Sequence, residues 1–253
     1  MVPELKGFLE LSFVDWPGRV TAVVFLPRCN FRCPYCHNHP LVLAPEQVAT
    51  VPLEAVLARL DALRGWVDGV CVTGGEPTLE PRLPELLAVF RSRGLGVKLD
   101  TNGSRPAVLA SLLAGGLLES VALDVKAPLE PIPYRRNAGA GADPAQVATS
   151  LELLARAEIP LEVRTTVHPS LLSQEEVRRL AAQVGAACAV RRGPAAEPVR
   201  FTLQRCRGED LLDGRLKALP PLPPEVFQEW EREARFAFTA AHLDLPPGGE
   251  YDL

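Results

Sequence analysis

The sequence predicts an α/β fold, an open partial (β/α)6 barrel that begins with a β-hairpin and ends with a helix. Short β-branched or apolar runs alternate along the chain with segments in which apolar residues recur at helical spacing. Such alternation favours a parallel sheet with right-handed crossovers. About six strands are visible, fewer than the eight that close a full barrel, so we expect the barrel to stay open on one side.

The first predicted element is a hairpin. Gly7 to Val14 and Arg19 to Leu26 have the pattern of extended segments, and they flank Asp15-Trp16-Pro17-Gly18. Proline followed by glycine suits the two central positions of a type II turn. The hairpin then leads into the first strand of the core.

Strands and helices alternate after the hairpin. The predicted strands are Val20–Leu26, Gly69–Thr73, Gly96–Asp100, Ser120–Val125, Leu161–Val167 and Val199–Gln204. Helical spacing of apolar residues marks Leu53–Leu63, Leu83–Phe90, Val108–Leu113, Val147–Leu154 and Val177–Leu180. Two of these helices carry start signals: Asp143 as N-cap with Pro144 at the first helical position, and a capping box of Ser173 and Glu176.

The composition changes after Gln204, and we divide the chain into a core, residues 1–204, and a C-terminal region, residues 205–253. Residues 205–224 contain a proline cluster and are typical of a linker or wrapped loop. Residues 225–241 are amphipathic and predict a helix packed on the core, with partner binding by its apolar stripe as the alternative. Residues 246–249 belong to a predicted frayed tail.

Composition narrows the functional classes. With 253 residues the chain can form a sizeable core, and its 47% apolar and 23% charged residues are typical of soluble globular proteins. The net charge of −4 provides no basic surface for nucleic acid or an anionic membrane. No apolar run reaches the ~18 residues of a spanning helix, and the first residues lack the pattern of a signal peptide. We therefore expect a cytoplasmic protein with neither nucleic acid nor membrane as partner.

Three of the six cysteines lie in one short stretch, Cys29-x-x-x-Cys33-x-x-Cys36. One loop can therefore direct three thiolates at a single inorganic centre. Zinc sites and cubane iron–sulfur clusters normally take four protein ligands, so three leave one metal position open. The spacing alone also fits a core cysteine cluster or a zinc site. The remaining cysteines, Cys71, Cys188 and Cys206, stand alone and are predicted to be buried structural residues.

Polar residues follow several predicted strands, at the edge where parallel α/β proteins bind ligands. Gly74 and Gly75 would let backbone approach a ligand closely, and Glu76 can accept from an ammonium group. The other polar residues in these positions are Asp100, Thr101, Asn102, Asp124, Lys126, Arg164 and Gln204. Because buried charges need partners, ion pairs of Lys126 with Asp100 or Asp124, and an ion pair of Arg164, are the alternatives to ligand binding.

The cysteine loop together with Gly74-Gly75-Glu76-Pro77 resembles the signature of the radical SAM enzymes. The resemblance implies that Cys29, Cys33 and Cys36 hold a [4Fe-4S] cluster whose fourth iron is chelated by S-adenosyl-L-methionine (SAM). The implied SAM-binding residues are Tyr35 against the adenine, Gly74, Gly75 and Glu76 at the amino group, Asn102 and Lys126 at other polar groups, Arg164 at the carboxylate or ribose, and Gln204. Asp100, Thr101 and Asp124 resemble the monovalent-cation site of pyruvate formate-lyase activating enzyme.

The resemblance also implies the reaction. A flavodoxin or ferredoxin-like reductant delivers an electron, SAM is cleaved to methionine and a 5′-deoxyadenosyl radical, and that radical abstracts a hydrogen atom. No protein side chain is expected to act as a catalytic acid or base.

The wider chain is similar to the activating enzymes of glycyl-radical enzymes. The matching stretches are Lys6–Gly18, the cysteine loop with His37 and Asn38, Leu99–Gly103, Asp124–Pro128 and Tyr134–Arg136. They resemble most the activating proteins of anaerobic ribonucleoside-triphosphate reductase. The implied product is a glycyl radical on that partner. Two other functions stay open: a radical SAM enzyme acting on a small molecule or another peptide, and a non-catalytic iron–sulfur or zinc protein.

Overall fold

The computed structural model describes residues 3–191 and 199–244, and its strands form one seven-stranded sheet in which the strands follow their order in the sequence. Strand β1 pairs with β2 in the antiparallel sense, whereas β2 with β3, β3 with β4, and β6 with β7 pair in parallel. The strands are β1 (Gly7–Ser12), β2 (Thr21–Leu26), β3 (Gly69–Gly74), β4 (Gly96–Thr101), β5 (Ser120–Asp124), β6 (Leu161–Val167) and β7 (Val199–Arg205).

Helices connect the strands, and their starts follow the local sequence. The α-helices are α1 (His39–Leu43), α2 (Leu53–Ala62), α3 (Leu83–Arg91), α4 (Pro106–Ala114), α5 (Pro131–Ala138), α6 (Pro144–Arg156), α7 (Gln174–Cys188) and α8 (Pro224–Leu243). The Asp143 side chain caps α6, and Ser173 and Glu176 form the expected capping box of α7. The sequence patterns did not predict α1 and α5.

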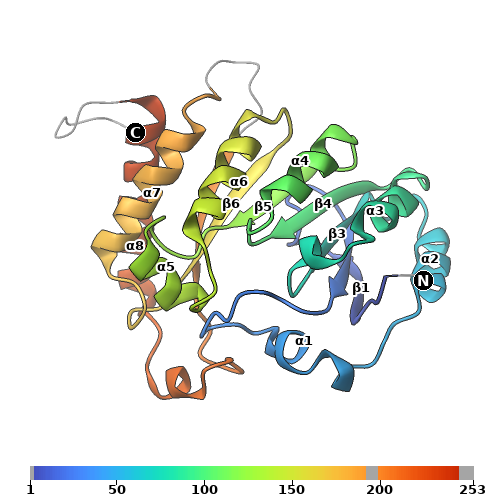
Figure 1. The fold of residues 1–253 in the computed structure, drawn as a ribbon, viewed down its shortest axis with the longest axis horizontal. Helices are drawn as coiled ribbons and strands as arrows, with labels where there is room; N and C mark the ends of the chain where they lie inside the picture. The colour runs from blue at the N-terminus through green and yellow to red at the C-terminus, as the bar shows by residue number, and fades with distance from the viewer. Residues whose placement is uncertain (1–2, 192–198, 245–253) are drawn as a thin grey trace. The chain divides into compact units, whose positions relative to one another are not determined.

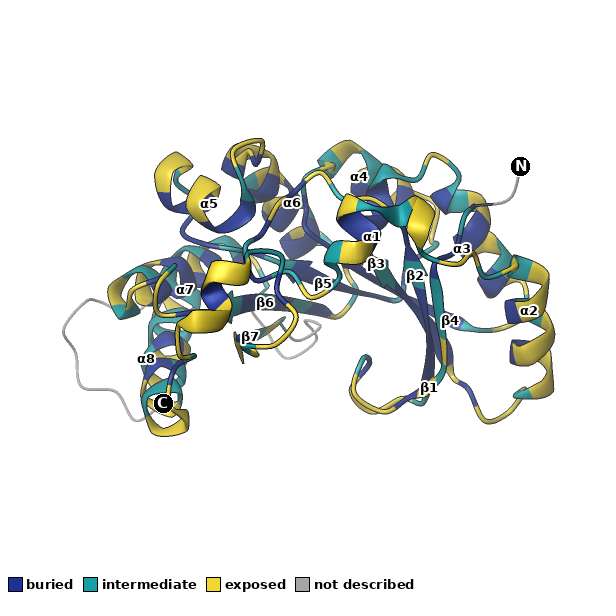
Figure 2. Cartoon of the chain, turned by 90° about the horizontal axis from the view of Figure 1, so that it is seen from below, coloured by how far each residue is buried: buried dark blue, intermediate teal, exposed yellow. Residues whose placement is uncertain are grey.

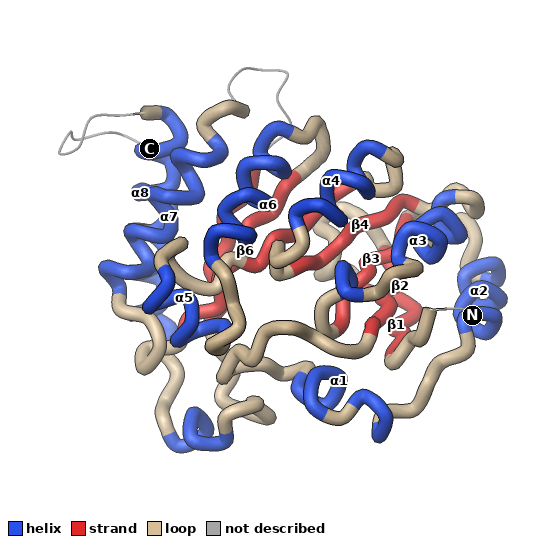
Figure 3. The backbone as a smooth tube through the Cα atoms, in the orientation of Figure 1, coloured by secondary structure: helices blue, strands red, loops and turns tan. Residues whose placement is uncertain are grey.

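The chain divides into two compact units, which are described separately. The first comprises residues 1–30 and 38–122 and contains β1 to β4 with α1 to α4. The cysteine stretch leaves β2 as an irregular loop before α1 (Figure 3). Helices α3 and α4 lie over one face of β3 and β4 (Figures 1 and 2). Strands β2 and β3 are almost entirely buried, as their near-continuous apolar sequences predict. Strand β4 is buried along its whole length although it contains the charged residues Lys98 and Asp100.

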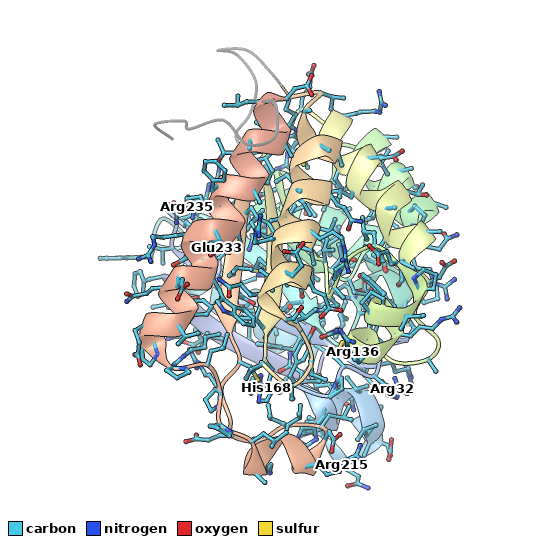
Figure 4. The ribbon with its side chains drawn as sticks, turned by 90° about the vertical axis from the view of Figure 1, so that its left-hand side faces the viewer. Arg32, Arg136, His168, Arg215, Glu233 and Arg235 are labelled. Atoms are coloured by element: carbon cyan, nitrogen blue, oxygen red, sulfur yellow. The ribbon has the colours of Figure 1, made fainter. Side chains whose placement is uncertain are left out.

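The second unit comprises residues 31–37 and 123–253 and contains β6, β7 and helices α5 to α8. Helices α7 and α8 lie side by side, and Figure 4 shows Glu233 and Arg235 on the outer helix α8. Gly185 of α7 permits this close approach, because a Cβ there would lie 2.3 Å from the carbonyl oxygen of Phe238. The predicted C-terminal helix is thus confirmed as α8.

The hairpin prediction is also confirmed, and its turn has a structural role in the first unit. Gly18 has a φ of 82°, as the predicted turn requires. Trp16 packs against Gly69 and Gly96, the first residues of β3 and β4, where a Cβ would meet its ring. Arg19 lies over the Trp16 ring, 4.3 Å from its centroid. The turn therefore lies at the starts of β3 and β4, whereas Glu76 and Asn102 follow the ends of these strands.

Within the described ranges, no helix combines the length and the apolar character needed to cross a lipid bilayer. The predicted tail at residues 246–249 lies outside the described residues. Cys71, Cys188 and Cys206 are buried and free of disulfides, as predicted.

Candidate functional site

In the first unit, the site centres on Glu76, which follows β3 and is 1% exposed. Its Oε1 accepts from the Thr78 N–H at 3.1 Å, the Thr78 hydroxyl at 2.5 Å and the Thr101 hydroxyl at 2.8 Å. Its Oε2 accepts from the Asn102 N–H at 2.7 Å. Burial raises the pKa of Glu76, and these four hydrogen bonds partly offset that increase. All four donors are neutral, so the buried carboxylate is suited to receive a cation.

The two glycines before Glu76 permit a close approach of the chain to itself. Gly74 has a φ of 127°, and a Cβ on Gly75 would lie 1.8 Å from the carbonyl oxygen of Arg28. The Gly75 N–H donates to Leu26 at 2.9 Å, and the Glu76 N–H donates to Arg28 at 2.7 Å. The approaching backbone is the segment that leads into the cysteine loop. The glycine pair therefore fixes Glu76 beside that segment.

Cys29 and Asn102 are in contact within the first unit. Asn102 is 6% exposed and follows β4, and its Nδ2 lies 3.7 Å from the Cys29 Sγ. The neighbouring Asp100 forms an ion pair with Lys98 at 3.1 Å. Lys98 also donates to the carbonyl oxygen of Asp15 at 2.5 Å. Asp100 thus has a cationic partner from its own strand, which the sequence reasoning had not weighed.

In the second unit, Cys33 and Cys36 lie in one tight turn. The Cys36 N–H donates to the Cys33 carbonyl at 3.0 Å. The start of this segment is fixed by Arg32, whose N–H donates to Ala138 at 2.8 Å, and by Phe31, which packs edge-on against Tyr134. Burial raises the pKa of the Cys33 thiol to about 11, although Lys126 opposes the increase. Cys33 must therefore lose its proton when it binds a metal.

A segment after β7, residues 206–213, holds this turn from the other side. The Leu212 N–H donates to the Cys36 carbonyl at 3.1 Å, and the Asp213 N–H donates to the Pro34 carbonyl at 2.9 Å. His37 donates from Nε2 to the Arg207 carbonyl at 3.3 Å. We call residues 206–213 the strap. It belongs to the stretch predicted as a linker or wrapped loop, and it supports the cysteine turn.

Three charged residues of the second unit form a connected group. Asp124 accepts from Arg164 Nε at 2.9 Å and from Lys126 Nζ at 3.0 Å. Burial alone would raise the pKa of Asp124, but Arg164 and Lys126 lower it to about 2. Burial would lower the pKa of Lys126, and the Asp124 charge outweighs that effect and raises it. Of the ion pairs that the sequence left as alternatives, the pair of Lys126 with Asp124 and an ion pair of Arg164 are therefore present.

Tyr35 and Gln204 differ in their surroundings. Tyr35 is 4% exposed, and its hydroxyl has no hydrogen-bond partner among the described residues. Gln204 is exposed at the end of β7 and accepts from the Thr166 hydroxyl at 3.3 Å. A buried phenol that lacks a polar partner is compatible with the predicted contact to an adenine, whereas the role of Gln204 stays a prediction.

The predicted residues thus fall in both units. Cys29, Gly74, Gly75, Glu76, Asp100, Thr101 and Asn102 belong to the first, and Cys33, Tyr35, Cys36, Asp124, Lys126, Arg164 and Gln204 to the second. Among the residues that the structure describes, no three His, Cys, Asp or Glu side chains are arranged to hold a metal ion. The three motif cysteines and the monovalent-cation residues remain predicted ligands.

The residues present fit an iron–sulfur cluster and a cationic nucleotide in their chemistry. Thiols are the usual ligands of such clusters, and Asn102 directs an N–H at one of them. Glu76 offers a buried carboxylate that accepts from four neutral donors. Sequence reasoning missed the strap and the contact from Asn102 to Cys29. The only sequence signal for the strap was the apolar pair Leu211-Leu212 within an otherwise polar loop.

The family model for the radical SAM superfamily matches residues 23–182 of this chain. The chain therefore belongs to the radical SAM superfamily. A Methanocaldococcus jannaschii protein that carries the provisional name glycyl-radical enzyme activating enzyme is 30% identical over 226 residues, which cover 87% of each chain. Within the superfamily, the chain is a member of the glycyl-radical enzyme activating enzymes. A pyruvate formate-lyase-activating enzyme of Staphylococcus aureus is 34% identical over 107 residues, covering 39% of this chain and 42% of that relative.

Solved structures agree on the fold. Streptococcus suis SuiB bound to the precursor peptide SuiA has a TM-score of 0.58 at 14% identity, covering 90% of this chain and 52% of SuiB. A domain of a pyruvate-formate lyase-activating enzyme from Bacteroides vulgatus has a TM-score of 0.50 at 16% identity, covering 67% of this chain and 94% of that domain. At these identities, the likeness concerns the α/β fold alone.

Proposed function

We propose that this enzyme generates a glycyl radical on a partner protein and that the partner is an anaerobic ribonucleoside-triphosphate reductase. The observation that carries the proposal is the pairing, in one unit, of a buried carboxylate with a cysteine of the cluster motif. Asn102 contacts both: its backbone donates to Glu76, and its side chain donates to Cys29. This arrangement supports binding of a cationic ligand beside a metal-ligating sulfur.

In this proposal, Cys29, Cys33 and Cys36 hold a [4Fe-4S] cluster. Glu76 accepts the amino group of SAM, because a buried carboxylate gains most from a cationic donor. Tyr35 covers the adenine. When bound, the cluster supplies the electron that cleaves SAM into methionine and a 5′-deoxyadenosyl radical. A flavodoxin or ferredoxin-like protein is the proposed reductant.

The charged group of Asp124, Lys126 and Arg164 has a positioning role in this proposal. Asp124 accepts from both cations. Lys126 is proposed to donate to a polar group of SAM, and Arg164 to its carboxylate or ribose. Asp124 is also proposed, with Asp100 and Thr101, as a ligand of a monovalent cation. That cation would compete with Lys126 and Arg164 for the Asp124 oxygens, so its binding should weaken as these pairs strengthen.

The partner is proposed from sequence resemblance together with the activating-enzyme membership. The membership favours a catalytic function over the non-catalytic iron–sulfur or zinc function. The alternative function is that of a radical SAM enzyme acting on a small molecule or another peptide.

The test uses the reconstituted enzyme under anoxic conditions with SAM, a reductant and an anaerobic ribonucleoside-triphosphate reductase. We expect the doublet signal of a glycyl radical in the electron paramagnetic resonance spectrum, and its absence with the Cys33→Ala variant. Formation of 5′-deoxyadenosine without any doublet on the reductase would contradict the proposed partner and favour another substrate.

A further inference from the structure

The amide side chain of Asn102 has a fixed orientation in the first unit. Its Oδ1 accepts from the Ser104 N–H at 2.9 Å, so its NH₂ group must face the other way. That group donates to Asn30 Oδ1 at 3.0 Å and to the Cys29 Sγ at 3.7 Å. Both side-chain N–H groups of Asn102 therefore have acceptors, and one of them is the sulfur of a motif cysteine.

The backbone of Asn102 is fixed as well. Its N–H donates to Glu76 Oε2 at 2.7 Å, and the residue is 6% exposed. The side chain consequently has little freedom to turn away from Cys29. The contact joins the end of β4 to the beginning of the cysteine loop, 73 residues earlier in the chain.

We propose that Asn102 is a positioning residue for Cys29: it holds the sulfur in place and, once the cluster is bound, raises the reduction potential of the cluster through an N–H···S hydrogen bond. The proposal rests on the proposed function, because it requires the [4Fe-4S] cluster. The physical reason is that reduction adds negative charge to the cluster and its sulfurs. A hydrogen bond to sulfur stabilises the more negative state, so it favours reduction.

This role differs from the SAM contact that the sequence resemblance implies for Asn102. If the side chain served SAM alone, its removal would weaken SAM binding and leave the SAM-free cluster unchanged. If it serves Cys29, its removal changes the cluster before any SAM is added. The two roles are therefore separable by measuring the potential in the absence of SAM.

The experiment measures the midpoint potential of the reconstituted, SAM-free enzyme by redox titration monitored with electron paramagnetic resonance. Asn102→Leu removes the donor without adding charge. We expect its one-electron reduction to be disfavoured roughly tenfold, which corresponds to a potential about 59 mV lower. Asn102→Ser is the second variant, because its shorter hydroxyl cannot span the same distance.

The matched control is Asn30→Ala. Asn30 is exposed, and its removal deletes the other acceptor of Asn102 while leaving Ser104 to orient the amide. We expect the potential of this variant to match that of the unaltered enzyme. SAM affinity is measured separately on each protein.

The outcomes distinguish the inference from the proposed function. An unaltered enzyme that takes up no cluster would refute the proposed function itself. Normal cluster content with an unchanged potential in both Asn102 variants would overturn the inference alone. Reduced iron and sulfide content in variants that retain the circular dichroism spectrum of the unaltered protein would support the positioning of Cys29 by Asn102.

Discussion

At the scale of single residues, the site depends on how buried charges are matched. Glu76 is surrounded by four neutral donors, whereas Asp124 is paired with two cations. The first environment keeps a carboxylate ready for an external cation. The second neutralises a carboxylate internally and fixes two cationic side chains. The two carboxylates therefore have opposite pKa shifts, upward for Glu76 and downward for Asp124.

The role of Glu76 predicts the behaviour of the Glu76→Gln variant. A charge-assisted hydrogen bond to an ammonium contributes about 1.5–3 kcal/mol, so we expect SAM affinity to fall at least about tenfold. Equilibrium binding to the anoxically reconstituted enzyme measures this loss. Glu80→Gln, in which the exchanged carboxylate accepts from the Arg82 N–H, is the control. Equal SAM affinity of the Glu76→Gln variant and the unaltered enzyme would remove Glu76 from the SAM site.

The Asp124 ion pairs predict a pH dependence of stability. Because the pKa of Asp124 falls from 3.8 to about 2 on folding, its ionised form favours the folded state. This contribution, about 2 kcal/mol, is complete above pH 3.8 and is lost as the pH falls through 2.

We therefore expect the free energy of unfolding of Asp124→Asn to lie below that of the unaltered protein at neutral pH. The difference should shrink between pH 3.8 and 2, as denaturant titrations at several pH values would measure. A difference that stays constant across this range would show that the ion pairs are not its source.

At the scale of elements, two connections hold the cysteine loop. In the first unit, the glycine pair after β3 lets the backbone at Leu26 and Arg28 form its hydrogen bonds. In the second unit, the strap donates two backbone N–H groups to the turn that contains Cys33 and Cys36. Both connections are made by backbone, so substitutions that alter backbone geometry test them.

Gly75→Ala should disrupt the first connection. The new Cβ would lie 1.8 Å from the Arg28 carbonyl oxygen, and backbone atoms must move to admit it. We expect a loss of about 2–4 kcal/mol in the free energy of unfolding. Gly141→Ala, where a Cβ meets nothing within 4 Å, should cost little. Chemical denaturation of both variants measures the difference, and equal stabilities would refute the packing argument.

Leu212→Pro should loosen the second connection, because proline has no N–H to donate to the Cys36 carbonyl. We expect a severalfold lower iron content after anoxic reconstitution. Leu212→Ala keeps the N–H and is the matched control, so any effect of losing the side chain appears in both variants. Iron uptake that is equal in the two variants would mean that the strap does not support the cysteine turn.

At the scale of the whole molecule, sequence patterns predicted the fold and the types of residue in the site. They did not predict which of these residues contact one another. The hairpin pattern identified β1, and strand–helix alternation identified β2 to β7, most plainly β2 and β3, because these buried parallel strands carry near-continuous apolar runs. Helix α5 escaped prediction because its sequence, Pro131–Ala138, contains two prolines and little apolar periodicity. The contact of Asn102 with Cys29 could not be predicted, because sequence spacing does not show which side chains meet across 73 residues.

The ion pairs show a second limit of sequence reasoning. The sequence left both a ligand role and a charge-pairing role open for Lys126, because either role suits a charged residue that follows a strand. The structure shows the pairing with Asp124. A contact between Lys126 and SAM remains part of the proposal. It is compatible with the ion pair, because an ammonium group has three N–H donors and Asp124 accepts from one of them.

The central claim is that Cys29, Cys33 and Cys36 together hold a cluster that enables this chain to cleave SAM. The most direct measurement is the formation of 5′-deoxyadenosine by anoxically reconstituted protein with SAM and dithionite. We expect formation by the unaltered enzyme and by Cys188→Ala, whose thiol is buried in α7, and none by Cys29→Ala, Cys33→Ala or Cys36→Ala. Equal formation by the unaltered enzyme and any one of these three variants would contradict the account.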